Sequence, residues 1–457
     1  MIYTTDTIAA IATPAAAGGI GIVRISGEQA LAVAERIFDP VRQTALTASK
    51  GYRAYFGHAV DGEQTLDEAV CLVFRAPHSY TGEDVAEISC HGGLYITQRV
   101  LEAALHAGAR PAQAGEFTKR AFLHGKMDLS AAEAVMSMVS AQGEQAAKAA
   151  LTALDGALHR RIRAVADKVI GAAAGMAAWV DYPDEDIEAV HNDKLKDTFM
   201  QAKAELTELL SRFDAGVAVT QGVDTVIVGR PNVGKSTLMN LLAGTEKSIV
   251  TQIPGTTRDI VEQTVRLGNL VLHLSDTAGI RETENPVEQI GVARALERME
   301  RAVLVLAVFD GASPLTREDR ELLENCRGKL AVAVLNKEDQ GAVVDERTIA
   351  DYVPAVVRIS AKDGSGYDAL CETVTKLLGT DAFDPSAAML ANTRQKDCCV
   401  RAVRWLTEAI DALDGGQTLD AVNVCADSCI EALLELTGEK AGEAVVQEVF
   451  SRFCVGK

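Results

Sequence analysis

The sequence lacks any apolar run of the roughly 20 residues that a membrane-spanning helix needs. Its longest apolar stretches, residues 169–180 and 302–309, are shorter than that. The N-terminus has no basic segment, so we expect no secretory signal. Aromatic side chains make up only 5% of the chain while alanine is frequent, a composition that favours helix. These absences predict a helix-rich, cytoplasmic protein without a membrane partner.

The chain also lacks a basic balance, because 64 Asp and Glu outnumber 45 Lys and Arg and give a formal net charge of −19. Proteins that bind nucleic acid unaided usually carry a basic surface. If this chain acts on RNA, a local patch or a partner must supply the positive field. The nine cysteines are odd in number and scattered, which favours reduced thiols. Cys425 and Cys429 lack the tight spacing of common zinc knuckles, so we predict that they pack in a core.

The length of 457 residues is too great for one core, and about three domains are expected. Residues 1–118 mix short β-like runs with turns and one helix-like stretch near 94–107, which indicates an α+β domain. The β-like runs are 20–25, 70–74 and 85–90.

Two helix-like stretches bracket an alternating segment. Residues 119–216 and 383–457 are expected to pack as one discontinuous all-helical domain. Residues 217–382 alternate helix-like segments with apolar runs that end in polar loops. This alternation predicts a doubly wound parallel sheet whose ligand lies at the carboxyl ends of the strands. The fold class is therefore multidomain α+β and α/β, with the α/β domain inserted into the helical one.

The segment "GRPNVGKST" carries a phosphate-binding pattern, since Gly229, Gly234, Lys235 and Ser236 match G-x-x-x-x-G-K-[ST]. In such a loop the glycines let backbone N–H groups approach phosphate, the lysine reaches the β- and γ-phosphates, and the hydroxyl offers a ligand to Mg²⁺. The pattern predicts a Ras-like P-loop domain.

Further loops follow in order, each at the end of an apolar run. They are Asp276–Gly279, Asn336–Asp339 and Ser360–Lys362. The carboxylate of Asp339 can accept hydrogen bonds from the N1–H and the amine of guanine, a donor pair that adenine lacks. We therefore predict that the nucleotide is GTP. In "VTQIPGTTRD" one threonine should cover Mg²⁺; we favour Thr257, with Thr256 as its neighbour.

The residue that follows Gly279 is Ile280, where many small GTPases place a glutamine that orients water. An isoleucine neither donates nor accepts a hydrogen bond, so a carboxylate from elsewhere is needed. Glu282, Glu284 and Glu288 are the alternatives, and their spacing does not choose among them.

Longer motifs carry a resemblance that covers essentially the whole chain. "TIAAIATPAAAGGIGIVRISG", "HSYTGEDVAEISCHGG", "GEFTKRAFLHGKMDLSAAEA" and the terminal "CVGK" resemble the MnmE (TrmE) family of tRNA-modifying GTPases. Small departures fall at 15–17, at Pro254 and at Val455.

The resemblance implies a specific activity. Members form homodimers through an N-terminal domain that binds 5-formyl- or 5,10-methylene-tetrahydrofolate. With the FAD-dependent partner MnmG, they add an aminomethyl or carboxymethylaminomethyl group to C5 of the wobble uridine of certain tRNAs. The partner would carry most of the tRNA contact, in keeping with the acidic charge of this chain.

The resemblance also assigns residues. It makes Glu288 the general base and gives K⁺ to Asn232, Thr251, Ile253 and Thr256, beside Ser236 and Thr257, which the loop patterns assign to Mg²⁺. It places folate at Arg24, Glu83, Lys126 and Lys457, with Cys454 either redox-active or buried near that pocket. The full set expected to bind GTP is Asn232, Val233, Gly234, Lys235, Ser236, Thr237, Thr251, Gln252, Ile253, Pro254, Gly255, Thr256, Thr257, Asp276, Thr277, Ala278, Gly279, Asn336, Lys337, Asp339, Ser360, Ala361 and Lys362.

Two other functions are compatible with a GTPase of this size. One is a ribosome-assembly switch that does no chemistry on RNA, although the acidic runs in the C-terminal helices count against it. The other is a scaffold that only docks MnmG.

Overall fold

A computed structural model describes residues 6–42, 44–181, 191–244, 262–275 and 296–456. The chain divides into two compact units, each described by itself. The first comprises Met1–Met136, Leu154–Lys203 and Arg401–Lys457, and the second Ser137–Ala153 and Ala204–Val400. Within the described ranges, no helix combines the length and the apolar character needed to cross a membrane.

The N-terminal part of the first unit is built on a sheet of seven strands, counted over the described residues. They are β1 (Ile8–Ile11), β2 (Ile20–Ser26), β3 (Phe38–Pro40), β4 (Arg53–Asp61), β5 (Gln64–Phe74), β6 (Val85–His91) and β7 (Arg110–Pro111), in the order β3-β4-β5-β6-β2-β1-β7. The pairs are antiparallel except β1 with β7, which is parallel. The β-like runs predicted from the sequence lie in β2, β5 and β6, which confirms them.

Two helices pack on this sheet. The helix α2 (Leu94–His106) confirms the predicted stretch, whereas α1 (Ala30–Ile37) was not predicted. Buried residues of α1 recur at the i, i+3, i+4 and i+7 spacing of an amphipathic helix. Their core partners are the inward residues of β2 and β6, such as Val23 and Ile88.

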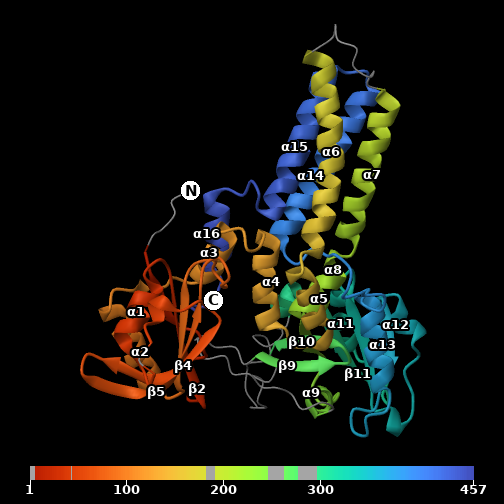
Figure 1. The fold of residues 1–457 in the computed structure, drawn as a ribbon. Coiled ribbons are helices and arrows are strands. Elements are labelled where there is room, and N and C mark those ends of the chain that lie inside the picture. The colour runs from red at the N-terminus through yellow and green to blue at the C-terminus, as the bar shows by residue number, and fades with distance from the viewer. Residues whose placement is uncertain (1–5, 43, 182–190, 245–261, 276–295, 457) are drawn as a thin grey trace. The chain divides into compact units, whose positions relative to one another are not determined.

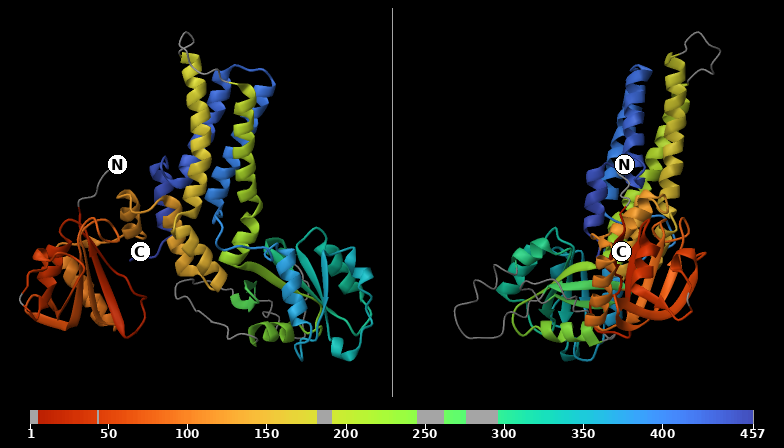
Figure 2. Two further views of the ribbon diagram at one scale, coloured as in Figure 1. Left: turned by 45° about the vertical axis from the view of Figure 1, so that its right-hand side comes forward. Right: turned by 60° about the vertical axis from the view of Figure 1, so that its left-hand side comes forward.

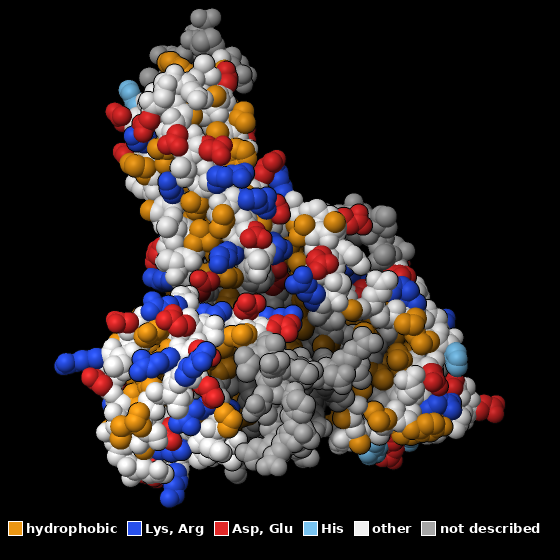
Figure 3. Space-filling view, turned by 180° about the vertical axis from the view of Figure 1, so that it is seen from behind, with side chains coloured by type: hydrophobic (Ala, Val, Ile, Leu, Met, Phe, Trp, Pro, Cys, Tyr) orange, Lys and Arg blue, Asp and Glu red, His pale blue; other side chains and the backbone are white. Residues whose placement is uncertain are grey.

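Helices dominate the segments that flank the second sheet, as expected. They are α3 (Glu116–Leu123), α4 (Leu129–Ser140), α5 (Glu144–Leu154), α6 (Ala157–Asp181), α7 (Asn192–Ser211), α8 (Phe213–Gln221), α14 (Thr393–Asp414), α15 (Leu419–Thr437) and α16 (Glu443–Ser451). The 3₁₀ turn η1 (Leu46–Ala48) lies earlier, between β3 and β4 of the N-terminal sheet. The helices α6 and α15 run side by side (Figures 1 and 2), and Arg163 pairs with Glu439 beyond the end of α15 at 2.6 Å. Acidic and basic side chains are interspersed along the long helices in Figure 3.

The cysteines of these helices confirm the core prediction. Cys398, Cys399 and Cys429 are buried and Cys425 is partly buried. Among the residues that the structure describes, no group of three or more His, Cys, Asp or Glu is placed to hold a metal ion.

The second unit contains the predicted α/β sheet. Its strands are β8 (Val223–Val228), β9 (Glu262–Leu267), β10 (Leu270–Ser275), β11 (Leu304–Asp310), β12 (Ala331–Asn336) and β13 (Ala355–Arg358), in the order β13-β12-β11-β8-β10-β9. The sheet is parallel except for β9, which pairs antiparallel with β10 through the turn at Gly268 and Asn269. The predicted doubly wound parallel sheet is therefore confirmed, and a hairpin adds the antiparallel strand β9 at its edge.

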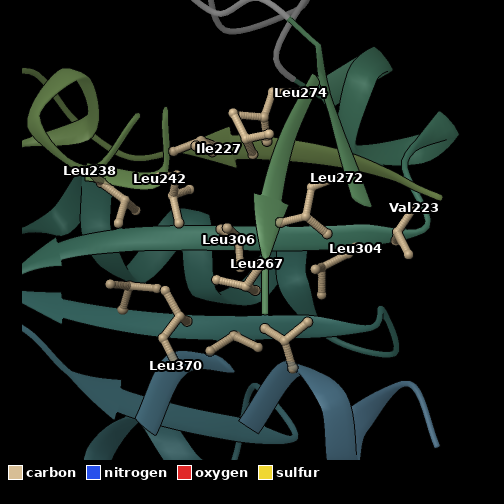
Figure 4. Packing of buried hydrophobic residues seen from close by; sticks show 14 of the residues in the cluster. Val223, Ile227, Leu238, Leu242, Leu267, Leu272, Leu274, Leu304, Leu306 and Leu370 are labelled. Atoms are coloured by element: carbon tan, nitrogen blue, oxygen red, sulfur yellow. The ribbon is translucent and has the colours of Figure 1, made fainter. Parts of the chain in front are cut away.

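Helices cover both faces of this sheet, as a doubly wound fold requires. They are α9 (Lys235–Gly244), α11 (Arg317–Cys326), α12 (Arg347–Ala350) and α13 (Tyr367–Leu377), with the short turn η2 (Glu338–Gln340). On one face, Leu238 and Leu242 of α9 and Leu370 of α13 pack on strand residues such as Ile227 and Leu306 (Figure 4). The apolar strands are thereby fixed, and their polar carboxyl ends are left to form loops.

Candidate functional site

The predicted phosphate loop lies between β8 and α9. Gly229 and Gly234 have φ values of 156° and 98°, and Asn232 has a φ of 63°. Few side chains adopt the left-handed region, but asparagine tolerates it better than most. A Cβ on Gly229 would lie 2.4 Å from the carbonyl oxygen of Val308, so glycine is needed there. The loop leads into the N-terminus of α9, where backbone N–H groups and the helix dipole favour phosphate.

Lys235, the first residue of α9, folds its side chain back over the loop. Its Nζ donates to the carbonyl oxygens of Gly229 and Arg230, at 2.9 Å each. Burial lowers the pKa of this ammonium group. An ammonium held by carbonyls rather than by water can exchange those partners for phosphate oxygens. Ser236 and Thr237 follow and are exposed, so their hydroxyls are open to a ligand.

Asn336 joins the phosphate loop to a loop predicted to bind the base. It is buried, with 3% of the residue exposed. Its Nδ2 donates to the carbonyl oxygen of Val233 at 2.8 Å, and its Oδ1 accepts from the N–H of Ala361 at 2.9 Å. A Cβ on Gly234 would lie 2.2 Å from that Nδ2. One buried amide therefore brings together the loops that follow β8, β12 and β13.

The predicted guanine-reading residue is oriented by a neighbouring loop. Ser360, which is fully buried, donates from Oγ to Oδ1 of Asp339 at 3.1 Å. Asp339 itself is exposed, as is Lys362. A carboxylate offers about four acceptor positions, so the hydroxyl leaves room for two donors of a base.

Two acidic residues that were not predicted, Asp310 and Asp319, form ion pairs with basic residues of these loops. Lys337, with a φ of 69°, donates from Nζ to Asp310 Oδ2 at 2.8 Å. Arg230 donates from Nε to the buried Asp319 at 3.3 Å and lies 3.9 Å from Asp310. Burial alone would raise the pKa of Asp310, but hydrogen bonds from Lys337 and from the N–H of Ala312 outweigh it and lower that pKa. Asp310 ends an apolar strand as Asn336 does, and that position was the signal available in the sequence.

Other predicted GTP and metal residues lie outside the described residues. They are Thr251, Gln252, Ile253, Pro254, Gly255, Thr256, Thr257, Asp276, Thr277, Ala278, Gly279 and Glu288, and the same is true of Lys457 in the predicted folate site.

The predicted folate residues of the N-terminal domain gather around the segment 76–84, which precedes β6. Arg24 on β2 donates from Nε to Glu87 at 2.7 Å, and its guanidinium lies 5.3 Å from the ring centre of Tyr80. Glu83 belongs to the segment itself. Lys126 is exposed and donates from Nζ to the carbonyl oxygen of Pro77 at 3.0 Å. Cations and a carboxylate beside an aromatic ring suit a flat heterocycle with an acidic tail.

The chain end is docked on this domain. Val455 forms a bridge with Ala114, and the carbonyl oxygen of Gly456 accepts from Arg24 Nη1 at 3.4 Å. The N–H of Gly115 donates to the carbonyl oxygen of Cys454 at 3.4 Å. Cys454 is exposed, so the expectation that it is buried near the pocket is wrong. The reason is that the backbone of the tail makes these contacts, which leaves the thiol to solvent.

A charge network centred on the buried side chain of Arg120 lies beside Glu83, and the sequence did not reveal it. Arg120 on α3 donates to Glu83, to Asp6 and to Glu116. Arg110 donates to Asp6 and Glu116 as well. The motif "GEFTKRAF" contains two of these residues, but the pattern gave no reason to separate them from a solvated helix surface.

Comparison with known proteins identifies the family to which the chain is similar. The model of the GTP-binding protein TrmE N-terminus matches residues 7–126, and that of the MnmE helical domain matches residues 129–454. The tRNA modification GTPase MnmE of Symbiobacterium thermophilum is 43% identical over 456 residues, covering 99% of each chain. The protein of the same name from Clostridioides difficile is 39% identical over 459 residues, covering 100% of each. Among solved structures, the G domain of the T. maritima FeoB iron transporter is 25% identical, with a TM-score of 0.26, covering 34% of this chain and 98% of that one. The chain belongs to the MnmE family of tRNA modification GTPases.

Proposed function

We propose that this protein hydrolyses GTP in a K⁺-dependent reaction and uses it to modify C5 of the wobble uridine in certain tRNAs. The observation that carries the proposal is the buried amide of Asn336, which assembles the phosphate and base loops in a chain similar to tRNA modification GTPases along its whole length. In the reaction, the FAD-dependent partner MnmG acts with this chain, and a tetrahydrofolate supplies the one-carbon unit. The product carries an aminomethyl or carboxymethylaminomethyl group.

Each described residue of the nucleotide site has a separate proposed role. Lys235 changes its hydrogen-bond partners from loop carbonyls to the β- and γ-phosphates, which places positive charge where negative charge develops. Asp339, oriented by Ser360, reads the guanine. Ser236 is the proposed Mg²⁺ ligand of this loop, and Mg²⁺ neutralises phosphate charge when bound.

The rest of the hydrolytic assignment falls outside the described residues and stays a proposal. Thr257 is the second Mg²⁺ ligand, Thr251, Ile253 and Thr256 complete the K⁺ shell with Asn232, and Glu288 is the general base.

The left-handed backbone of Asn232 allows a direct test of the K⁺ assignment. Asn232→Gly keeps that backbone conformation but removes the amide oxygen. We expect this variant to bind GTP and to lose the acceleration by K⁺ over Na⁺ at equal ionic strength. Glu288→Ala should bind GTP and not hydrolyse it in either salt. Equal rates of the unmodified protein in K⁺ and Na⁺ would contradict the K⁺ dependence, and an active Glu288→Ala would contradict the base.

Folate binding is proposed for the N-terminal domain, at Arg24, Glu83 and Lys126 with Lys457. The docked tail supports this, because the carbonyl oxygen of Gly456, which precedes Lys457 in the sequence, accepts from Arg24. Titration of the protein with 5-formyl-tetrahydrofolate tests the assignment.

A homodimer is proposed through the outer face of the N-terminal sheet. Phe56 on β4 lies opposite Val70 on β5, and both are exposed, by 56% and 36%. Neighbouring exposed apolar side chains on paired strands favour burial against a second copy. Sedimentation of the unmodified protein and of Phe56→Asp tests this, since the charge should favour monomers.

We also propose the domain limits expected from the sequence: 1–118 for folate binding and dimerisation, 119–216 with 383–457 for the helical domain, and 217–382 for the GTPase domain. The strand β7 ends at Pro111 and β8 begins at Val223, so each sheet lies on the expected side of these limits, while 118 falls within α3 and 216 within α8.

A further inference from the structure

Glu83 is held by two partners from outside its own segment. Ser26 on β2 donates from Oγ to Glu83 Oε2 at 2.7 Å, and Arg120 on α3 donates from Nη1 to Oε1 at 3.0 Å and to Oε2 at 3.2 Å. The hydroxyl of Ser26 also lies 2.7 Å from that of Thr81. Both supporting residues are nearly inaccessible, since the Arg120 side chain is 3% exposed and Ser26 is fully buried. The carboxylate is therefore fixed from two sides.

Arg120 cannot easily turn away from Glu83, because its other contacts hold it in place. Nη1 donates to the carbonyl oxygen of Asp6 at 2.8 Å, while Nη2 donates to Asp6 Oδ1 at 2.8 Å and to Glu116 Oε1 at 3.0 Å. Burial alone would raise the pKa values of Asp6 and Glu116, but hydrogen bonds from Arg110 and Arg120 lower both. A buried guanidinium whose planar fork is held by several carboxylates is preorganised.

We propose that Arg120 is a positioning residue, which with Ser26 orients the Glu83 carboxylate to accept two donors of a pterin ring. This inference rests on the proposed folate-binding function. A carboxylate has about four acceptor positions, and the two partners leave some of them unused. A pterin presents a ring N–H beside an amino group, a donor pair that a correctly turned carboxylate meets with both oxygens. A carboxylate free to rotate would pay an entropic cost on binding that the fixed one avoids.

The chain offers a matched control for this role. Arg110 belongs to the same network and donates to Asp6, to Glu116 and to the carbonyl oxygen of Pro111, rather than to Glu83. Loss of Arg110 therefore disturbs the network without releasing the folate-contacting carboxylate. Arg120→Lys keeps the positive charge and removes the fork, whereas Ser26→Ala frees the carboxylate from the other side.

The experiment is a double-mutant cycle on folate affinity. Binding of 5-formyl-tetrahydrofolate is measured calorimetrically for the unmodified full-length protein, R120K, E83Q, R120K/E83Q, S26A and R110Q, with a melting curve and GTP turnover for each. We expect R120K and S26A to weaken binding by about tenfold, the size typical of residues that orient a ligating group. In the E83Q background, R120K should change the affinity by less than about twofold, because the carboxylate it positions is gone. R110Q should bind folate within about twofold of the unmodified protein, and GTP turnover should stay constant throughout.

Several results would overturn the positioning role. These are an unchanged affinity in R120K and S26A, an equal loss from R120K with and without E83Q, or a loss in R110Q as large as in R120K. If R120K melts early, S26A decides the question alone. Failure of the unmodified protein to bind folate would instead refute the folate part of the proposed function.

Discussion

Replacing Asn336 removes the amide that joins the phosphate loop to the Ser360–Lys362 loop. In Asn336→Ala, the carbonyl oxygen of Val233 and the N–H of Ala361 lose their partners. Each buried, unsatisfied backbone group costs about 1–3 kcal/mol, so the variant should lose at least about 2 kcal/mol. Asn336→Asp keeps an acceptor for Ala361 but sets a carboxylate oxygen against the Val233 carbonyl, so it should also be destabilised.

The loss of stability in Asn336→Ala can be measured by thermal unfolding. For a unit of roughly 150–250 residues, about 1 kcal/mol shifts the melting temperature by about 2–4 °C. The transition of the second unit should therefore fall by at least about 4 °C in Asn336→Ala, and GTP affinity should fall with it. A control is Asn325→Ala on α11, which removes one exposed bond to the carbonyl oxygen of Glu321 and should change stability by less than about 0.5 kcal/mol. If Asn336→Ala melted and bound GTP like Asn325→Ala, the reasoning that this amide assembles the site would be refuted.

Three further predictions concern Asp339, Asp310 and the C-terminal tail. Asp339→Asn should weaken GTP binding and relax selection toward xanthine nucleotides, because one acceptor becomes a donor; competition binding measures this, and unchanged GTP affinity would remove the guanine assignment. Because hydrogen bonds from Lys337 and Ala312 overcome burial and lower the pKa of Asp310, its contribution to stability is present above the ordinary aspartate pKa of about 4 and is lost as the pH falls through the lower folded value. Denaturant unfolding should accordingly show Asp310→Asn less stable than the unmodified protein at neutral pH, and the difference in their free energies of unfolding should shrink as the pH falls. A difference independent of pH would contradict the ion pair. Removal of Cys454–Lys457 should abolish folate binding and tRNA modification while GTP turnover persists; intact folate affinity would show that the docked tail has no role in the pocket, and loss of turnover with early melting would indicate misfolding.

The sequence placed the described nucleotide loops at strand ends, because the residues of each loop are consecutive and follow an apolar run. Gly229 follows β8, Asn336 ends β12 and Ser360 follows β13, and the packed parallel strands bring those ends to one edge. The pattern could not reveal that Asn336 is the physical link between the loops, since its partners Val233 and Ala361 are contacted through backbone atoms.

The supporting charges were beyond sequence reasoning for a different reason. Arg120 meets Asp6 across 114 positions and Glu83 across 37, and no local spacing relates such residues. A charged residue on a helix is normally solvated, so burial of Arg120 could be learned only from the fold. The strand β9 was missed because "EQTVRL" is short and mostly polar, and it becomes a strand by pairing with β10.

The central claim is that GTP hydrolysis by this chain drives modification of the tRNA wobble uridine. The most direct test is nucleoside analysis of tRNA from cells that lack the protein, complemented with the unmodified chain or with Lys235→Ala. We predict that aminomethyl and carboxymethylaminomethyl uridines disappear without the protein, return with the unmodified chain, and stay absent with Lys235→Ala. An unchanged nucleoside profile in cells without the protein would contradict the account.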